Sequence, residues 1–234
     1  GVLLGIGLIV GAFSATGLAG TLVNDLIFLA GDSIMALLLM GALTAFVFGR
    51  GMTVTACYIF LAVVLAPALE QAGLNVLAVH LFILYWGMVS YITPPVALGA
   101  FAAATLAGAS AFRTGLEAMR LGGVLYIVPF FFVLNPALVG EAGAFEVVTV
   151  FATAIIGVWL MSGAIQGHVS LVGGLGTGAV GAGLRVLLLL AGLLIAAPGA
   201  TVLDLGIGHW QITGLGVLLA ALPLTLARRQ AASA

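Results

Sequence analysis

The sequence predicts an all-α integral membrane protein with several membrane-crossing helices, one re-entrant hairpin and one broken transmembrane helix. The first observation is the composition: of 234 residues, 64% are hydrophobic and 6% are charged, and the mean hydropathy is +1.37, whereas a soluble domain carries about 25% charged residues. The second is a series of apolar runs near the ~20 residues that a helix needs to cross a bilayer. The third is a pair of adjacent prolines, Pro94 and Pro95, inside one such run.

The few charged residues exclude two classes of function. The chain has no lysine, its basic residues are six arginines, and its formal net charge is −1. It therefore lacks the basic patch that a nucleic-acid partner would need. The phosphate-binding motif Gly-x-x-x-x-Gly-Lys cannot occur without lysine, so the chain does not drive itself with ATP. Cys57 is the only cysteine, and no disulfide can form within the chain.

The first predicted helix covers about residues 2–23 and ends near the polar residues Asn24 and Asp25. The chain begins at Gly1, without a methionine, inside an apolar segment. We therefore expect an N-terminal remainder of the protein to precede it.

Two short apolar runs come next, at about 33–48 and 52–69, and each falls below the ~20 residues of a full crossing. The turn Gly-Arg-Gly at 49–51 joins them, and Glu70 ends the second. Two short apolar halves around a polar turn predict a re-entrant hairpin over 33–69, with its tip at membrane depth.

The next apolar run, 76–109, is too long for one ordinary crossing, and Thr93-Pro94-Pro95 divides it. Each proline removes a backbone N–H, and its ring clashes with the preceding turn. Carbonyl groups of that turn are then left without helical partners. A plain kink in a spanning helix is the alternative. A broken helix is favoured because the break and a hairpin tip occur together in one chain.

Four further helices are predicted at about 119–138, 145–163, 184–200 and 211–227. The glycine-rich segment 166–183 is predicted to be a loop or an interfacial segment.

The charges separate onto two faces of this predicted topology. Basic residues mark the cytoplasmic side of a membrane protein, so the hairpin is expected to open toward the outside. If 33–69 were two full spans, the same separation would follow, so the charges indicate orientation only. The expected cytoplasmic residues are Arg113, Arg120, Arg185, Arg228 and Arg229, and the expected outer residues are Asp32, Glu70, Glu141, Glu146 and Asp204.

Broken helices at membrane depth expose backbone groups, and transporters use them: unwound carbonyls coordinate Na⁺ and half-helix N-termini face anions. Ser90 and Thr93 can add hydroxyl oxygens, and the glycines at 49 and 51 let the hairpin tip expose more carbonyls. We therefore expect the tip and the break to bind Na⁺ together.

Arg50 is a candidate for substrate binding because an intramembrane arginine costs ~2.5–3.5 kcal/mol on insertion scales and can pair with a carboxylate through two hydrogen bonds. The alternative is that it reaches the interface or pairs with a tip carbonyl. Thr53 and Thr55 are further substrate candidates. His80 is predicted to be an interfacial or packing residue rather than a proton relay. No Ser/His/Asp set, paired carboxylates or metal-ligand spacing appears, so no enzyme activity is expected.

Four segments carry a family resemblance: "GRGMTVTACYIFLAVVLAPAL" (49–69), "AVHLFILYWGMVSYITPPVALGAFAAATLAGA" (78–109), "FRTGLEAMRLG" (112–122) and "IVPFFFVLNPAL" (127–138). On these, residues 1 to about 137 resemble the C-terminal half of the large membrane subunit of TRAP transporters, the tripartite ATP-independent periplasmic family. Among these, the chain looks like the fused permeases, in which the small and large subunits form one chain.

The resemblance implies an elevator-type secondary transporter in the cytoplasmic membrane of a bacterium or archaeon. Its coupling ion would be Na⁺, its partner an extracytoplasmic solute-binding protein, and its substrate a small organic anion such as a dicarboxylate, keto acid or amino acid. Residues 1–140 would form the second of two inverted repeats, and residues 141–234 accessory helices. The implied sodium site comprises Gly49, Gly51, Met52, Ser90, Thr93, Pro94 and Pro95.

The hairpin tip departs from the family pattern. Where "GMGMPTTA" is expected, this chain has "GRGMTVTA", so Arg50 replaces an apolar methionine, Thr53 a proline and Val54 a threonine. Two alternatives therefore stay open. One is another hairpin-containing carrier, such as a divalent-anion:sodium symporter, and the other is a non-transporting membrane scaffold subunit.

Overall fold

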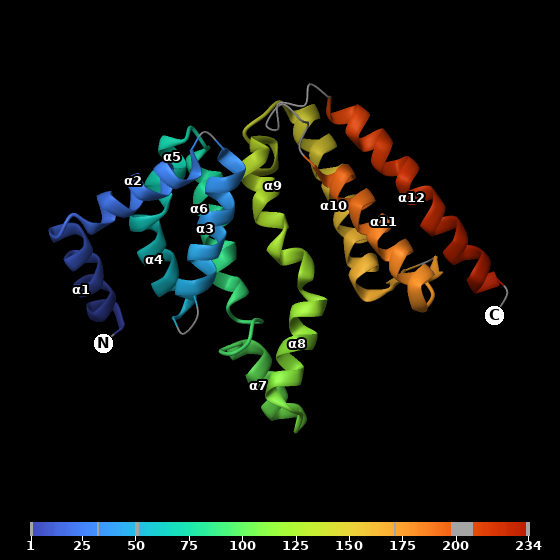
Figure 1. The fold of residues 1–234 in the computed structure, drawn as a ribbon, viewed down its shortest axis with the longest axis horizontal. Helices are drawn as coiled ribbons and strands as arrows, with labels where there is room; N and C mark the ends of the chain where they lie inside the picture. Colours follow the sequence, from blue (N-terminus) through green and yellow to red (C-terminus); the bar gives the residue numbers. More distant parts are fainter. Residues whose placement is uncertain (1, 32, 50–51, 171, 198–207, 233–234) are drawn as a thin grey trace. The chain divides into compact units, whose positions relative to one another are not determined.

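A computed structural model of the chain describes residues 2–31, 33–49, 52–170, 172–197 and 208–232. These residues are α-helical apart from turns, two short 3₁₀ helices and one pair of two-residue strands. The chain forms two compact units, Gly1–Met119 and Arg120–Ala234 (Figure 1). Three described helices are long and apolar enough to cross a membrane, or up to four if one bent helix pair counts as a span. The all-α, multi-pass membrane class predicted from the sequence is confirmed.

The first unit begins with two helices, α1 (Val2–Ala15) and α2 (Leu18–Ala30). The prediction of a single helix over 2–23 is wrong on two counts. The chain breaks at Gly17, whose φ of 70° is left-handed and suits glycine because it has no Cβ. The helix α2 then runs through Asn24 and Asp25, which lie on its exposed side, where polar side chains do not interrupt a helix.

The predicted hairpin forms three helices: α3 (Ile34–Gly49), α4 (Val54–Val64) and α5 (Ala66–Gln71). The second arm is divided at Leu65 because Pro67, near the start of α5, has no N–H to continue the α4 ladder. The rings of Phe48 on α3 and Phe60 on α4 lie 5.0 Å apart, so the two arms pack side by side, as Figure 1 shows.

The next two helices are α6 (Val76–Val89) and α7 (Leu98–Ala107), separated by the double proline. Asn75 caps α6, since its Oδ1 accepts from the Ala78 N–H at 3.0 Å. The helix α6 packs against both hairpin arms. The rings of Phe46 on α3 and Trp86 on α6, for example, meet edge to face at 6.2 Å. The short helix α8 (Ala111–Leu121) follows.

The predicted helix over 119–138 is wrong. The chain there passes from the end of α8 through a 3₁₀ turn, η1 (Gly123–Tyr126), the helix α9 (Val128–Leu134) and a second 3₁₀ turn, η2 (Pro136–Val139). Two adjacent glycines at 122–123 and prolines near the starts of α9 and η2 divide it, because neither residue type favours a helix interior.

The second unit contains three long helices, α10 (Ala144–Gln166), α11 (Gly178–Ala196) and α12 (His209–Ala232). The helix α11 packs between the other two. It begins at Gly178, six residues before the predicted 184, so the glycine-rich residues 178–183 belong to the helix. Residues 167–170 and 172–177 of the predicted loop are non-helical and include an antiparallel pair, β1 (His168–Val169) with β2 (Gly173–Gly174), whereas Gln166 still belongs to α10.

Charged groups lie at opposite ends of α10. Glu146 is in its first turn. At its last turn the Arg120 guanidinium donates to the Gln166 carbonyl at 3.3 Å, and the Arg185 guanidinium occupies the space that a Cβ at Gly167 would fill. Negative charge at the start of a helix and positive charge at its end both stabilise the helix by interacting favourably with its dipole.

Candidate functional site

The tip end of the hairpin, where α3 ends at Gly49, lies against the C-terminal end of α6. Gly49, the last residue of α3, is buried. A Cβ at this position would lie 3.7 Å from Ser90 Cβ and 3.5 Å from Cys57 Sγ, so α3, α4 and α6 converge here. Arg50 and Gly51, which follow, lie outside the described residues.

Small side chains permit this convergence. A Cβ added at Gly87 of α6 would lie 3.6 Å from Cys57 Sγ, which is ordinary van der Waals contact. Cys57 is itself fully buried, at 0% exposure. The three helices therefore approach closely, as small residues allow at helix interfaces in membranes.

The break between α6 and α7 runs from Ser90 to Ala97. It begins with tightened turns, in which the Tyr91 N–H donates to the Met88 carbonyl at 3.0 Å and the Ile92 N–H to the Val89 carbonyl at 3.1 Å. Ala97 ends it with a positive φ of 26° and 0% exposure. The peptide between the two prolines is cis.

The carbonyl of Tyr91 accepts two hydrogen bonds from the start of α7. The donors are the N–H groups of Gly99, at 3.1 Å, and Ala100, at 3.3 Å. First-turn N–H groups of a helix have no partner within that helix. The sequence predicted carbonyls without helical partners before the prolines. For Tyr91 the structure instead supplies donors from the far side of the break.

Two buried hydroxyl groups lie at the break. Ser90 is 8% exposed and Thr93 2% exposed. The Ser90 hydroxyl donates to the Gly87 carbonyl, and the Thr93 hydroxyl to the Val89 carbonyl, both at 2.7 Å. A hydroxyl oxygen keeps two acceptor lone pairs when its proton is donated, so both oxygens can serve as ligands to a cation.

The remaining sequence-predicted residues differ in their surroundings. The Thr53 hydroxyl accepts from the Ala56 N–H at 3.3 Å and so caps the start of α4. Thr55 is exposed, and Met52 is half-buried in the bend before α4. At the break, Pro95 is exposed and Pro94 half-buried.

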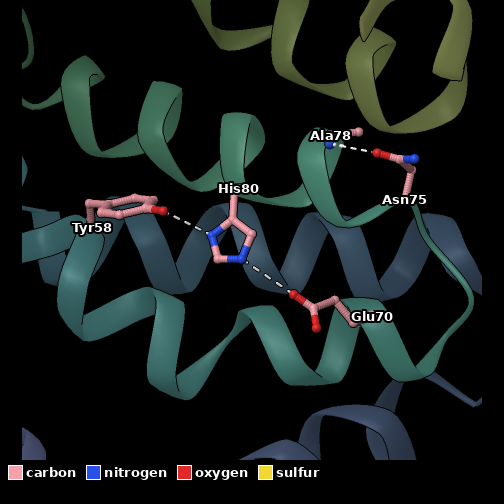
Figure 2. A network of polar contacts seen from close by, with 5 residues as sticks. All are labelled: Tyr58, Glu70, Asn75, Ala78 and His80. Atoms are coloured by element: carbon pink, nitrogen blue, oxygen red, sulfur yellow. Dashed lines mark hydrogen bonds and ion pairs between the residues drawn. The ribbon is translucent and has the colours of Figure 1, made fainter. Parts of the chain in front are cut away.

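A polar network at the far end of the hairpin joins three helices (Figure 2). The Tyr58 hydroxyl of α4 lies 3.0 Å from His80 Nδ1 of α6, and His80 Nε2 lies 3.4 Å from Glu70 Oε1 of α5. If Tyr58 donates to Nδ1, the proton of the neutral ring is on Nε2, which faces the carboxylate. The network fastens the outgoing hairpin arm to the helix that leads into the break.

Sequence reasoning considered His80 alone and missed its two partners. No local pattern could have found them, because Tyr58 and His80 are 22 residues apart. The prediction that His80 is an interfacial or packing residue stays a prediction. Among the described residues, no group of three or more His, Cys, Asp or Glu side chains could hold a metal ion.

Comparison with known families matches residues 1–147 to DctM, described as the DctM component of the tripartite ATP-independent periplasmic transporter. Neither the curated proteins nor the solved structures contain a match to the chain. The family is one of transport permeases rather than enzymes, and the matched residues include both the hairpin and the broken helix. The chain therefore belongs to the TRAP transporters, as a member of the family of their large permease component.

Proposed function

We propose that the chain is part of a sodium-coupled permease that imports small organic anions delivered by an extracytoplasmic solute-binding protein. It would lie in the cytoplasmic membrane of a bacterium or archaeon. Family membership supports this proposal, since a TRAP permease associates with a solute-binding protein and with the membrane. The observation that carries it is the close approach of Gly49, at the hairpin end, to Ser90, at the start of the break, where a Cβ at 49 would lie 3.7 Å from Ser90 Cβ.

The cation would bind where the hairpin tip meets the break. Its proposed ligands are the Ser90 and Thr93 hydroxyls together with backbone carbonyls of both segments, including Gly49, Gly51 and Met52. Residues 90–97 contain no acidic side chain. Neutral oxygen ligands favour a monovalent cation, because fewer charged ligands weaken divalent binding. Pro94 and Pro95 would keep the backbone unwound.

The anion would be bound through Arg50, with hydroxyl groups of Thr53 and Thr55 nearby. A guanidinium matches a carboxylate with two parallel hydrogen bonds. The carboxylate would also lower the repulsion between Arg50 and a neighbouring Na⁺. Dicarboxylates, keto acids and amino acids all offer such a group.

The repeat proposed for residues 1–140 is supported by the family match, which ends at 147. The boundary between the two compact units of the structure falls earlier, between Met119 and Arg120. The family match is the better guide to the extent of the transport region, because compactness reports packing density and not descent from a repeat. Residues 141–234 would then be accessory transmembrane helices.

The test is sodium-dependent uptake by the full-length permease with its binding protein, comparing Thr93→Val with Thr44→Val. Valine keeps the shape and deletes the oxygen. Thr44 is a matched control, because its hydroxyl donates to the Met40 carbonyl at 2.8 Å within α3, away from the break. We expect Thr93→Val to raise the sodium concentration for half-maximal uptake about tenfold, the loss of ~1.4 kcal/mol of binding. If the sodium dependence of uptake is unchanged in Thr93→Val, Thr93 is not a sodium ligand.

A further inference from the structure

The helix α8 is amphipathic and has one buried residue, Gly115. Its charged residues, Arg113, Glu117 and Arg120, are exposed, and so are the apolar residues Phe112 and Leu116. The buried glycine therefore marks the point at which α8 packs against the rest of the first unit.

Gly115 packs on the first proline of the break. A Cβ at this position would lie 2.7 Å from Pro94 Cγ, 3.3 Å from Pro94 Cδ and 3.5 Å from Phe101 Cε1 of α7. A proline ring is closed onto its own backbone and cannot rotate away. Any side chain at 115 would therefore displace either α8 or the backbone of the break.

We propose that Gly115 is a positioning residue for the cation site: it seats α8 on the Pro94 ring and thereby fixes the oxygens of the break. Thr93 immediately precedes Pro94, so a displaced ring also displaces the Thr93 hydroxyl and its hydrogen bond to the Val89 carbonyl. The inference rests on the proposed sodium function and adds a residue that touches neither ion nor substrate.

Helix propensity alone would favour alanine at this position, since glycine is the poorest helix former after proline. The cost of Gly115→Ala would come from the contact with Pro94. Gly20 of α2 is the matched control, because a Cβ there meets nothing within 4 Å. Gly20→Ala gains the same propensity without the clash.

The experiment measures thermal unfolding of the full-length permease in detergent across a NaCl titration, with choline chloride holding ionic strength constant. We expect sodium to raise the unfolding temperature of the wild type and Gly20→Ala equally. In Gly115→Ala, the sodium concentration for half the shift should rise about fivefold or more, as overpacking at a rigid contact predicts. Superimposable sodium titrations in all three proteins would overturn the inference.

A second comparison, made without sodium, tests the contact itself. Pro94→Ala removes Cγ, which would lie closest to a Cβ at 115, so adding Gly115→Ala to this variant should cause little further loss of stability. If the stability losses of the two substitutions were additive, Gly115 and Pro94 would not be energetically coupled. This result would overturn the proposal that Gly115 acts through its contact with Pro94. A wild-type protein that shows no sodium response would overturn the sodium function, while the non-additivity would still report the contact.

Discussion

The two units of this chain use apolar sequence in opposite ways. Helices α3 to α7 of the first unit contain 16, 11, 6, 14 and 10 residues, whereas α10 to α12 of the second contain 23, 19 and 24. At 1.5 Å per residue, only the second set is long enough to cross a ~30 Å hydrocarbon core without interruption. The first unit brings helix ends close together, and at the break its backbone groups are paired across the interruption rather than within one helix. The second satisfies its backbone within each helix.

Prolines show the same contrast. Pro223 lies inside α12, which continues to Ala232, while Pro94 and Pro95 end α6. A single proline removes one helical hydrogen bond. Two adjacent prolines remove two and also drive both Thr93 and Pro94 out of the helical region, because each precedes a proline. The pair therefore terminates a helix where a single proline is accommodated.

The largest effect is expected from disrupting the packing of α10 against α11 in the second unit. A Cβ at Gly157 of α10 would lie 2.5 Å from both the Gly192 carbonyl oxygen and the Ala196 Cβ of α11, so Gly157→Leu must separate the two helices. Overpacking costs ~1–3 kcal/mol and occasionally more, and the contact with backbone places this substitution at or above the upper end. Thermal unfolding in detergent measures the loss. Gly183→Leu, on an exposed position of α11 with nothing within 4 Å of its Cβ, should be tolerated, and equal losses would contradict the packing seen here.

The next largest effect is expected from substitutions that would turn the broken helix into a continuous one. Replacing Pro94 and Pro95 together by alanine should allow α6 to extend toward α7 and should reduce sodium-dependent uptake at least tenfold, about 1.4 kcal/mol of lost coupling. Hydrogen exchange of residues 90–97 should slow at the same time. Pro223→Ala is the control and should leave uptake unchanged. Full uptake by the double variant would show that the break is not needed for transport.

A moderate effect is expected at the start of α6. Asn75→Ala removes the acceptor for the Ala78 N–H and should lower the free energy of unfolding by about 1 kcal/mol, as for other N-caps. Thr53→Ala at the start of α4 should cost less, because its hydrogen bond is longer, at 3.3 Å, and Thr53 is exposed. Amide exchange at Ala78 that does not change in Asn75→Ala would argue against the cap.

The smallest effect is expected from Glu70, in the polar network of Figure 2. Tyr58→Phe deletes the hydroxyl partner of His80 Nδ1 and should cost ~0.5–1.5 kcal/mol. Glu70→Gln should cost less, since the His80–Glu70 pair is about one-third exposed and exposed ion pairs contribute little. Thermal unfolding of both variants in one detergent gives the order, and a larger loss for Glu70→Gln would show that the carboxylate, and not the hydroxyl, fastens the hairpin arm to α6.

The sequence by itself determined the membrane class, the two short hairpin arms and the double-proline break. These follow from composition, from the lengths of apolar runs and from the missing proline N–H groups, all of which act locally. It also indicated Ser90 and Thr93 as hydroxyl groups at the break. It did not predict the division of α1 from α2, since a glycine within a helix is often tolerated and its φ is set by packing.

Only the tertiary structure decided which groups meet at the site. The Tyr91 carbonyl is paired with N–H groups eight and nine residues later, Gly115 packs on Pro94, and His80 lies between Tyr58 and Glu70. Each contact depends on how separate helices are placed, and a nearly uniform apolar sequence carries little periodic signal to orient them. Apolar runs therefore give the lengths of helices, while close contacts at glycine, proline and the few polar side chains fix their arrangement.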